Sequence, residues 1–208
     1  MNNESDINNT CGLLRVKLAK LEIIITSPVV VIGAASCVVA ICLITASKGY
    51  RSYTHRINLY LAITALCRTV AIGLQVLPID INQPSNATVR VKSGWDVPCA
   101  AIGFLTEYLF QSESLIRIWI CTYVFVFAFF RFQLNHTKCE ITGLLITFIL
   151  PALTTWIPFI DNSYGLTGTN CWVITKCNGR HVEGYVYLIL IEDALYSAFL
   201  IISAVMVA

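Results

Sequence analysis

The sequence predicts an all-α integral membrane protein, a helical bundle with five transmembrane helices. Two observations carry this prediction. Apolar residues make up 57% of the 208-residue chain and charged residues only 12%, which is far from the composition of an ordinary soluble domain. The apolar residues also gather in five segments of about 20 residues or more, the length that a helix needs to cross the hydrocarbon core of a bilayer.

A polar tail of residues 1–22 precedes the predicted bundle, which fills residues 23–208. The tail contains no apolar core of the kind found in a cleavable signal peptide, so we expect the first helix to direct membrane insertion. The five predicted helices cover residues 23–46, 57–79, 98–131, 141–160 and 185–208.

The first two segments are nearly free of charge. Residues 23–46 are almost wholly apolar, with Pro28 near the start, where a missing backbone N–H costs least. Residues 57–79 are apolar apart from a few polar side chains, and Arg68 is their charged residue. Residues 80–97, which follow, contain Pro84 and Gly94 and are expected to form a loop.

We expect residues 98–131 to lie in the middle of the bundle. This segment is long enough to cross a bilayer, yet it contains Glu107, Gln111, Glu113 and Arg117. An unpaired charge at the bilayer centre costs about 2.5 kcal/mol or more, so such a helix needs neighbours that cover its polar face.

The fourth segment, residues 141–160, contains Pro151 and Pro158, which predict a kink and a distorted end. The next linker is too polar and too rich in glycine to cross a membrane. Residues 185–208 then form the fifth apolar segment, which stops at Ala208 without a polar flank.

Glu192 and its neighbour Asp193 lie about two turns into the fifth segment. Adjacent residues point about 100° apart on a helix, so at most one of the two faces any given partner. Glu192 either faces the bundle or stays near the headgroups, and the sequence leaves both interpretations open.

The other intramembrane charges raise a similar question. If successive helices run in opposite directions, a rise of about 1.5 Å per residue brings Arg68 to a depth between those of Glu107 and Glu113. Arg68 could then pair with a glutamate, or Glu113 could pair with Arg117, four residues further along one helical face. Such residues form either a buried structural ion network or part of a ligand-binding or switching site.

No sequence motif points to catalysis. The three histidines lie in separate linkers, and no metal, nucleophile or phosphate-binding pattern occurs, so we expect neither an enzyme nor a bound cofactor. The net charge of +2 is spread over short linkers rather than gathered in one patch, which argues against binding to nucleic acid. We expect membrane lipid to surround the predicted helical bundle.

We infer the orientation of the bundle from sequons and cysteines. The distribution of Lys and Arg, by contrast, slightly favours an N-terminus inside the cell. Potential glycosylation sites occur at Asn3, Asn8 and Asn86 on one predicted side, although a fourth sequon, at Asn135, falls on the other. The side of the first three sequons also contains Cys99, Cys171 and Cys177. A disulfide from the third helix to the loop before the fifth would need an oxidising, extracellular face. We therefore expect the N-terminus outside a plasma membrane.

Three stretches together resemble the cyclic-AMP-receptor-like G-protein-coupled receptors, which are related to the secretin and adhesion receptors. The first is Tyr50-Arg-Ser-Tyr-Thr-His-Arg56 with the Ile57-Asn-Leu-Tyr-Leu-Ala62 that follows. The second is Cys99-Ala-Ala-Ile-Gly-Phe-Leu-Thr-Glu-Tyr108, with Trp119 further along the same segment. The third is Tyr164-Gly-Leu-Thr-Gly-Thr-Asn-Cys-Trp-Val173, which is similar to the family's Gly-x-x-Gly-x-x-Cys-Trp loop.

The resemblance implies a disulfide between Cys99 and Cys171, with Trp172 helping to pin the loop over a pocket. It also implies a seven-helix receptor that senses an extracellular ligand and couples to a heterotrimeric G protein, of which this chain contains the first five helices. No Asp-Arg-Tyr motif stands at the end of the third helix, where the sequence is Phe129-Phe-Arg131, so the chain does not resemble a rhodopsin-type receptor.

Two other functions fit the same residues. In a small transporter or channel component, Arg68, Glu107, Glu113 and Glu192 would line a path for a solute or for protons. In a non-signalling truncated receptor, the chain would trap full-length copies in mixed oligomers.

Overall fold

The computed structural model describes residues 16–47, 52–77, 79, 93–130, 136–160, 164–167 and 170–173. This part of the chain is mostly helical. Four of its helices are long and apolar enough to cross a membrane, which indicates a membrane protein. They are α2 (Val16–Ala46), α3 (Tyr53–Leu74), α4 (Asp96–Phe130) and α5 (His136–Thr155). The predicted fifth helix, at 185–208, lies outside the described residues.

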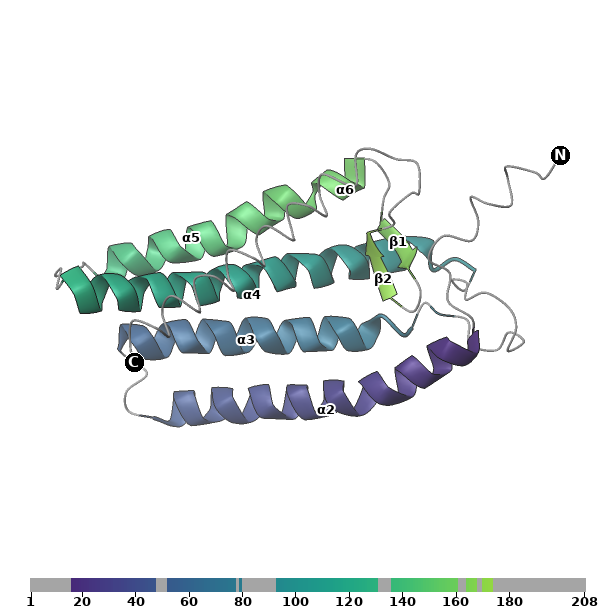
Figure 1. The fold of residues 1–208 in the computed structure, drawn as a ribbon, viewed down its shortest axis with the longest axis horizontal. Helices are drawn as coiled ribbons and strands as arrows, with labels where there is room; N and C mark the ends of the chain where they lie inside the picture. The colour runs from purple at the N-terminus through teal and green to yellow at the C-terminus, as the bar shows by residue number, and fades with distance from the viewer. Residues whose placement is uncertain are drawn as a thin grey trace.

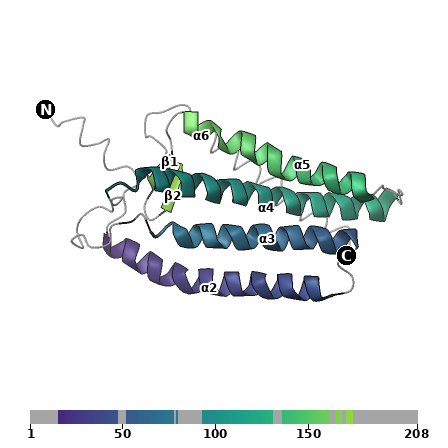
Figure 2. The ribbon, with the colours of Figure 1, turned by 180° about the vertical axis from the view of Figure 1, so that it is seen from behind.

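The four long helices lie side by side in chain order, with α2 at one edge and α5 at the other (Figure 1). Figure 2 shows the same order from behind. Each helix packs against the next and runs in the opposite direction, and α3 also touches α5. The third predicted segment therefore contacts helices on both sides, as its polar residues required.

Several helix ends differ from the predicted ones. Helix α2 begins at Val16 rather than Ile23, and α3 covers Tyr53–Leu74 rather than 57–79. Ser52 caps α3, where its hydroxyl accepts a hydrogen bond from the backbone N–H of His55. Backbone hydrogen bonding and caps set these ends, whereas the prediction followed only the apolar residues.

The end of the fourth segment is irregular, as Pro158 predicted, whereas the helix continues through Pro151. Helix α5 begins at His136, earlier than expected, includes Pro151 and ends at Thr155. After a turn at Trp156, the chain forms the short helix α6 (Ile157–Ile160). Pro158 lies within α6, and proline cannot donate the backbone hydrogen bond that a continuous helix would need there.

A β-hairpin follows α6 in place of the expected irregular loop. Strand β1 (Tyr164–Thr167) pairs antiparallel with β2 (Asn170–Val173), with Leu166 opposite Cys171. The hairpin packs on the first turns of α4 (Figure 1). We call this the hairpin end of the bundle.

The interior of the bundle contains polar as well as apolar side chains, whereas its outside is largely apolar. The buried face of α4 contains a run of polar side chains, Gln111, Ser112, Glu113 and Ser114, with Glu107 one turn earlier. Large apolar side chains on α2 and α5 are exposed, and none of the most apolar stretch of α2 is buried. This distribution suits a bundle whose outer surface meets lipid rather than water.

Candidate functional site

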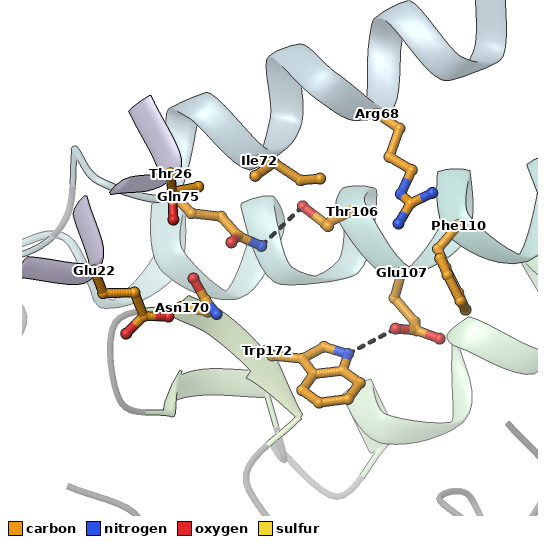
Figure 3. Close-up of a pocket in the computed structure, with 10 residues that line it drawn as sticks. All are labelled: Glu22, Thr26, Arg68, Ile72, Gln75, Thr106, Glu107, Phe110, Asn170 and Trp172. Carbon is orange, nitrogen blue, oxygen red and sulfur yellow. Dashed lines mark hydrogen bonds between the residues drawn. The ribbon is translucent and has the colours of Figure 1, made fainter. Parts of the chain in front are cut away.

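A cavity of about 350 Å³ opens at the hairpin end, between α2, α3, α4 and β2 (Figure 3). Its volume is in the range of small-molecule sites in proteins. Ten residues line it: Glu22, Thr26, Arg68, Ile72, Gln75, Thr106, Glu107, Phe110, Asn170 and Trp172. Residues from four elements that are far apart in sequence therefore meet around one space.

Trp172 and Glu107 form one wall of the cavity. The indole Nε1–H of Trp172 donates a hydrogen bond of 2.6 Å to Glu107 Oε2 (Figure 3). Glu107 is 3% exposed, whereas Trp172 on β2 is 43% exposed. The buried carboxylate thus fixes the indole at its nitrogen and leaves part of the ring uncovered.

Gln75 links α3 to both α4 and the hairpin. Its side-chain Nε2 donates to Thr106 Oγ1 at 3.2 Å and to the Cys171 carbonyl oxygen at 3.4 Å. Gln75 is itself buried. The amide therefore joins three elements at one point of the cavity lining.

A chain of hydrogen bonds runs from the cavity wall to α5. Glu107 accepts through Oε1 from Gln111 Nε2 at 3.2 Å, one turn further along α4. Gln111 in turn accepts from the hydroxyl of Thr154 on α5 at 2.7 Å. Trp172, Glu107, Gln111 and Thr154 thus connect β2, α4 and α5 through three successive contacts.

Glu113 is shared by two arginines. Its Oε2 accepts from Arg68 Nη1 of α3 at 2.9 Å, and its Oε1 pairs with Arg117 of α4. The Arg68 guanidinium also lies over the ring of Phe110, 4.6 Å from the centroid. Both pairings that the sequence allowed for Glu113 are present together.

A disulfide joins Cys99 of α4 to Cys171 of β2, with 5.2 Å between the α-carbons. Both residues are fully buried. This is the pair that the receptor resemblance implied. It fixes β2 on α4 one residue before Trp172, so the cavity wall is covalently anchored.

The opposite end of the bundle contains a second polar cluster. Arg56 of α3 donates from Nε to both carboxylate oxygens of Glu140 on α5, at 2.9 and 3.1 Å. The Tyr60 hydroxyl donates to Glu140 Oε1 at 3.0 Å. Arg56 and Glu140 lie just before the predicted helices 57–79 and 141–160, whereas the structure includes both in helices.

Trp119 joins α4 to α3 beside this cluster. Its Nε1–H donates to the Tyr53 hydroxyl at 3.0 Å, and that hydroxyl lies 3.4 Å from Cys139 Sγ of α5. Gly143 of α5 faces the indole so closely that a Cβ there would lie 2.5 Å from Trp119 Cε2. The absence of a side chain at Gly143 lets α4 and α5 approach each other.

The predicted site residues other than the two disulfide cysteines fall into three groups. Arg68, Glu107 and Trp172 line the cavity, while Gln111, Glu113 and Arg117 bond to one another or to lining residues without themselves lining it. The third group lies outside the described residues: Asn3, Asn8, Asn86, Cys177 and Glu192.

Seven lining residues were not singled out from the sequence. Glu22 was assigned to the tail because the first helix was expected to begin after it. Gln75 and Thr106 are polar residues inside apolar segments, the signal that did identify Gln111. Asn170 could not be placed without the hairpin. Within the described part of the chain, no group of His, Cys, Asp and Glu side chains could hold a metal ion.

No protein-family profile matches this chain, and a search of curated proteins finds no significant relative.

Proposed function

We propose that this chain is the first part of a membrane receptor of the G-protein-coupled type, which binds an extracellular ligand and couples to a heterotrimeric G protein. The hairpin end would face outwards at the plasma membrane, and the cluster of Arg56 and Glu140 would face the cytosol. Further helices after the described residues would complete the bundle.

The chain of hydrogen bonds from the cavity to α5 carries this proposal. A ligand that contacts Trp172 or Glu107 acts on a carboxylate already bonded to Gln111, and Gln111 is bonded to Thr154. If the ligand fits one arrangement of these side chains better than another, its differential affinity shifts the balance between two helix packings. This is the physical requirement for carrying a signal through a bundle.

The disulfide and the order of the helices support the same function. Antiparallel helices that pack in chain order, with a hairpin pinned over one end, agree with the architecture that the resemblance implies. The ion pair of Arg68 with Glu113 joins α3 to α4, whereas the pair of Arg56 with Glu140 joins α3 to α5. A shift of α3 would therefore alter contacts with both neighbouring helices.

A transporter or channel is the second candidate because Arg68 and Glu107 border the cavity. Against it, Glu113 is absent from the described cavity lining and is held by Arg68 and Arg117. Charged residues that bond to each other favour a fixed contact over a solute path.

Guanine-nucleotide exchange tests the receptor proposal. Membranes from cells that express the receptor from its whole reading frame, with the further helices included, should bind a non-hydrolysable GTP analogue faster than membranes without it when each class of Gα subunit is supplied. Replacing Thr154 by Val removes the hydroxyl that donates to Gln111 and should change that rate. The matched control is Thr45→Val on α2, where an exposed hydroxyl bonds only to its own helix in the described structure.

Exchange at the background rate with every Gα class would contradict the receptor proposal. In that case, ion or solute flux into liposomes containing the purified chain would favour the transporter.

A further inference from the structure

The side-chain amide of Gln75 has a fixed orientation in the cavity lining. Its Nε2 donates to Thr106 Oγ1 and to the Cys171 carbonyl oxygen. A carbonyl oxygen can only accept, and the single hydroxyl proton of Thr106 is already donated to the Ile102 carbonyl oxygen, at 2.8 Å. Both neighbours therefore require the nitrogen of the amide, and the amide oxygen must point elsewhere.

The oxygen of this amide is an acceptor that the described part of the chain leaves unused. Gln75 is 5% exposed, yet its Oε1 accepts no hydrogen bond from any described residue. Oε1 is not among the fully enclosed atoms that lack a partner there, so it reaches the cavity that Gln75 lines. Figure 3 shows the amide nitrogen turned to Thr106 and the oxygen turned away from it. A buried acceptor is costly to leave unmatched, which favours a ligand that donates to it.

The charged side chains of the lining are engaged in other ways. Both oxygens of Glu107 accept hydrogen bonds from the protein, and Arg68 pairs with Glu113. A ligand could bind either group only in competition with these contacts. Glu22 is exposed, so water competes for its carboxylate. The amide oxygen, by contrast, accepts a hydrogen bond without breaking one that the protein makes.

An apolar surface completes the cavity. Ile72 of α3, Phe110 of α4 and Trp172 of β2 line it together (Figure 3). The Trp172 ring is 43% exposed and is held at its nitrogen by Glu107, so part of a large aromatic surface is uncovered in a fixed place. Aromatic rings bury much apolar area and pack well on one another. A volume of about 350 Å³ suits a small ring system.

We propose that the cavity binds a small neutral aromatic molecule with an N–H or O–H group, which donates to Gln75 Oε1 while the ring lies against Ile72, Phe110 and Trp172. The inference rests on the proposed function in that it takes this cavity as the ligand site of the receptor. It goes further by naming the chemical class of the ligand and Gln75 as the residue that selects it.

Indole and benzofuran test the inference, because both are neutral and they have nearly the same size and shape. Indole carries an N–H group, whereas benzofuran has in its place an oxygen that cannot donate. Their dissociation constants are measured by saturation-transfer NMR on the protein expressed from its whole reading frame, in phosphatidylcholine nanodiscs, with empty nanodiscs as the blank. Indole should bind about tenfold more tightly than benzofuran, since only indole satisfies the buried oxygen. Equal binding, tighter binding of benzofuran, or no binding of either probe would overturn the proposal.

Two variants separate the polar contact from the apolar one. Gln75→Met replaces the amide by a thioether of similar length that accepts only weakly, so it should weaken indole by about tenfold and leave benzofuran within about twofold. Ile72→Ala removes apolar contact and should weaken both probes alike. The control is Thr69→Val, also on α3, whose hydroxyl donates to its own helix at Ala65 and which is not part of the cavity lining. It should change neither dissociation constant, and a preference for indole that survives Gln75→Met would contradict the role of Gln75.

A third variant decides the case in which Gln75→Met binds neither probe because its cavity does not form. Thr106→Val keeps Gln75 but removes one of the two acceptors that fix the amide. Its oxygen is then held less firmly towards the ligand, and the preference for indole over benzofuran should fall by about threefold. An unchanged preference in Thr106→Val would overturn the proposal.

The two proposals fail in different ways. A preference for indole without nucleotide exchange on any Gα class contradicts the receptor and leaves the ligand class standing. Nucleotide exchange together with no preference for indole contradicts the ligand class alone.

Discussion

Gly103 of α4 lies against the backbone of Cys171 in β2. A Cβ at position 103 would sit 2.9 Å from the Cys171 carbonyl oxygen and 3.1 Å from its carbonyl carbon. Neither atom belongs to a side chain that could rotate away. The hairpin therefore reaches α4 only because position 103 has no side chain.

Gly103→Ala should displace the hairpin and lower the free energy of unfolding in detergent by about 1–3 kcal/mol. Gly33→Ala on α2 is the matched control, because its new Cβ would meet Thr69 at an ordinary 3.5 Å. The control should change stability by about 1 kcal/mol or less, since alanine favours a helix. Equal effects of the two variants would show that the contact with Cys171 does not limit the fold.

Removing the disulfide should destabilise the hairpin end. Cys99→Ser and Cys171→Ser each open a cross-link between residues 72 apart, for which chain entropy predicts a loss of up to about 4 kcal/mol. The double variant should be at least as stable as the less stable of the two single variants, because all three variants lack the same disulfide. Thermal unfolding of the four proteins, with gel mobility compared with and without reductant, checks both expectations.

Glu113→Gln should cost more stability than the loss of either arginine that it binds. The Glu113 side chain is 4% exposed, and its removal leaves two guanidinium groups without their carboxylate, at a cost of about 3–5 kcal/mol. Arg68→Met or Arg117→Met leaves Glu113 with the other arginine, so each should cost less. The order of the three denaturation midpoints is the measurement, and a midpoint for Glu113→Gln above those of both arginine variants would contradict the shared role of Glu113.

Arg56 and Glu140 should be energetically coupled. In a double-mutant cycle with Arg56→Gln and Glu140→Gln, the coupling free energy of unfolding should be about 1–3 kcal/mol, because Nε and Nη2 of the guanidinium both donate to a partly buried carboxylate. Tyr60→Phe removes a single hydrogen bond to the same carboxylate and should cost about 1 kcal/mol. A coupling near zero would mean that the pair contributes nothing to the packing of α3 on α5.

The sequence predicted the helices through their apolar runs but placed their ends less well. A long apolar run has one stable form in a membrane, so four spans could be located. The run does not show where the helix continues into water, and for that reason Glu22, Arg56 and Glu140 were all assigned to the tail or linkers. These are residues of the cavity and of the cluster at the opposite end.

The site was partly visible in the sequence, because polar residues are costly in an apolar segment. That cost identified Arg68, Glu107, Gln111 and Glu113, and helical spacing gave the pair of Glu113 with Arg117. The bond between Trp172 and Glu107 joins residues 65 positions apart and depends on the hairpin, which propensity alone did not predict. In the structure, β2 alternates exposed and buried residues, with Cys171 and Val173 inside. The sequence does not show this alternation, because Trp172 between them is apolar as well.

The disulfide makes α4 and the hairpin a single mechanical unit. Cys171 is bound to α4 and Trp172 is its next residue, so the indole can turn about its own side-chain bonds but cannot travel away from Glu107. Sliding of this unit against its neighbours must then occur where α3 and α5 meet it, at Gln75 on one flank and Thr154 on the other.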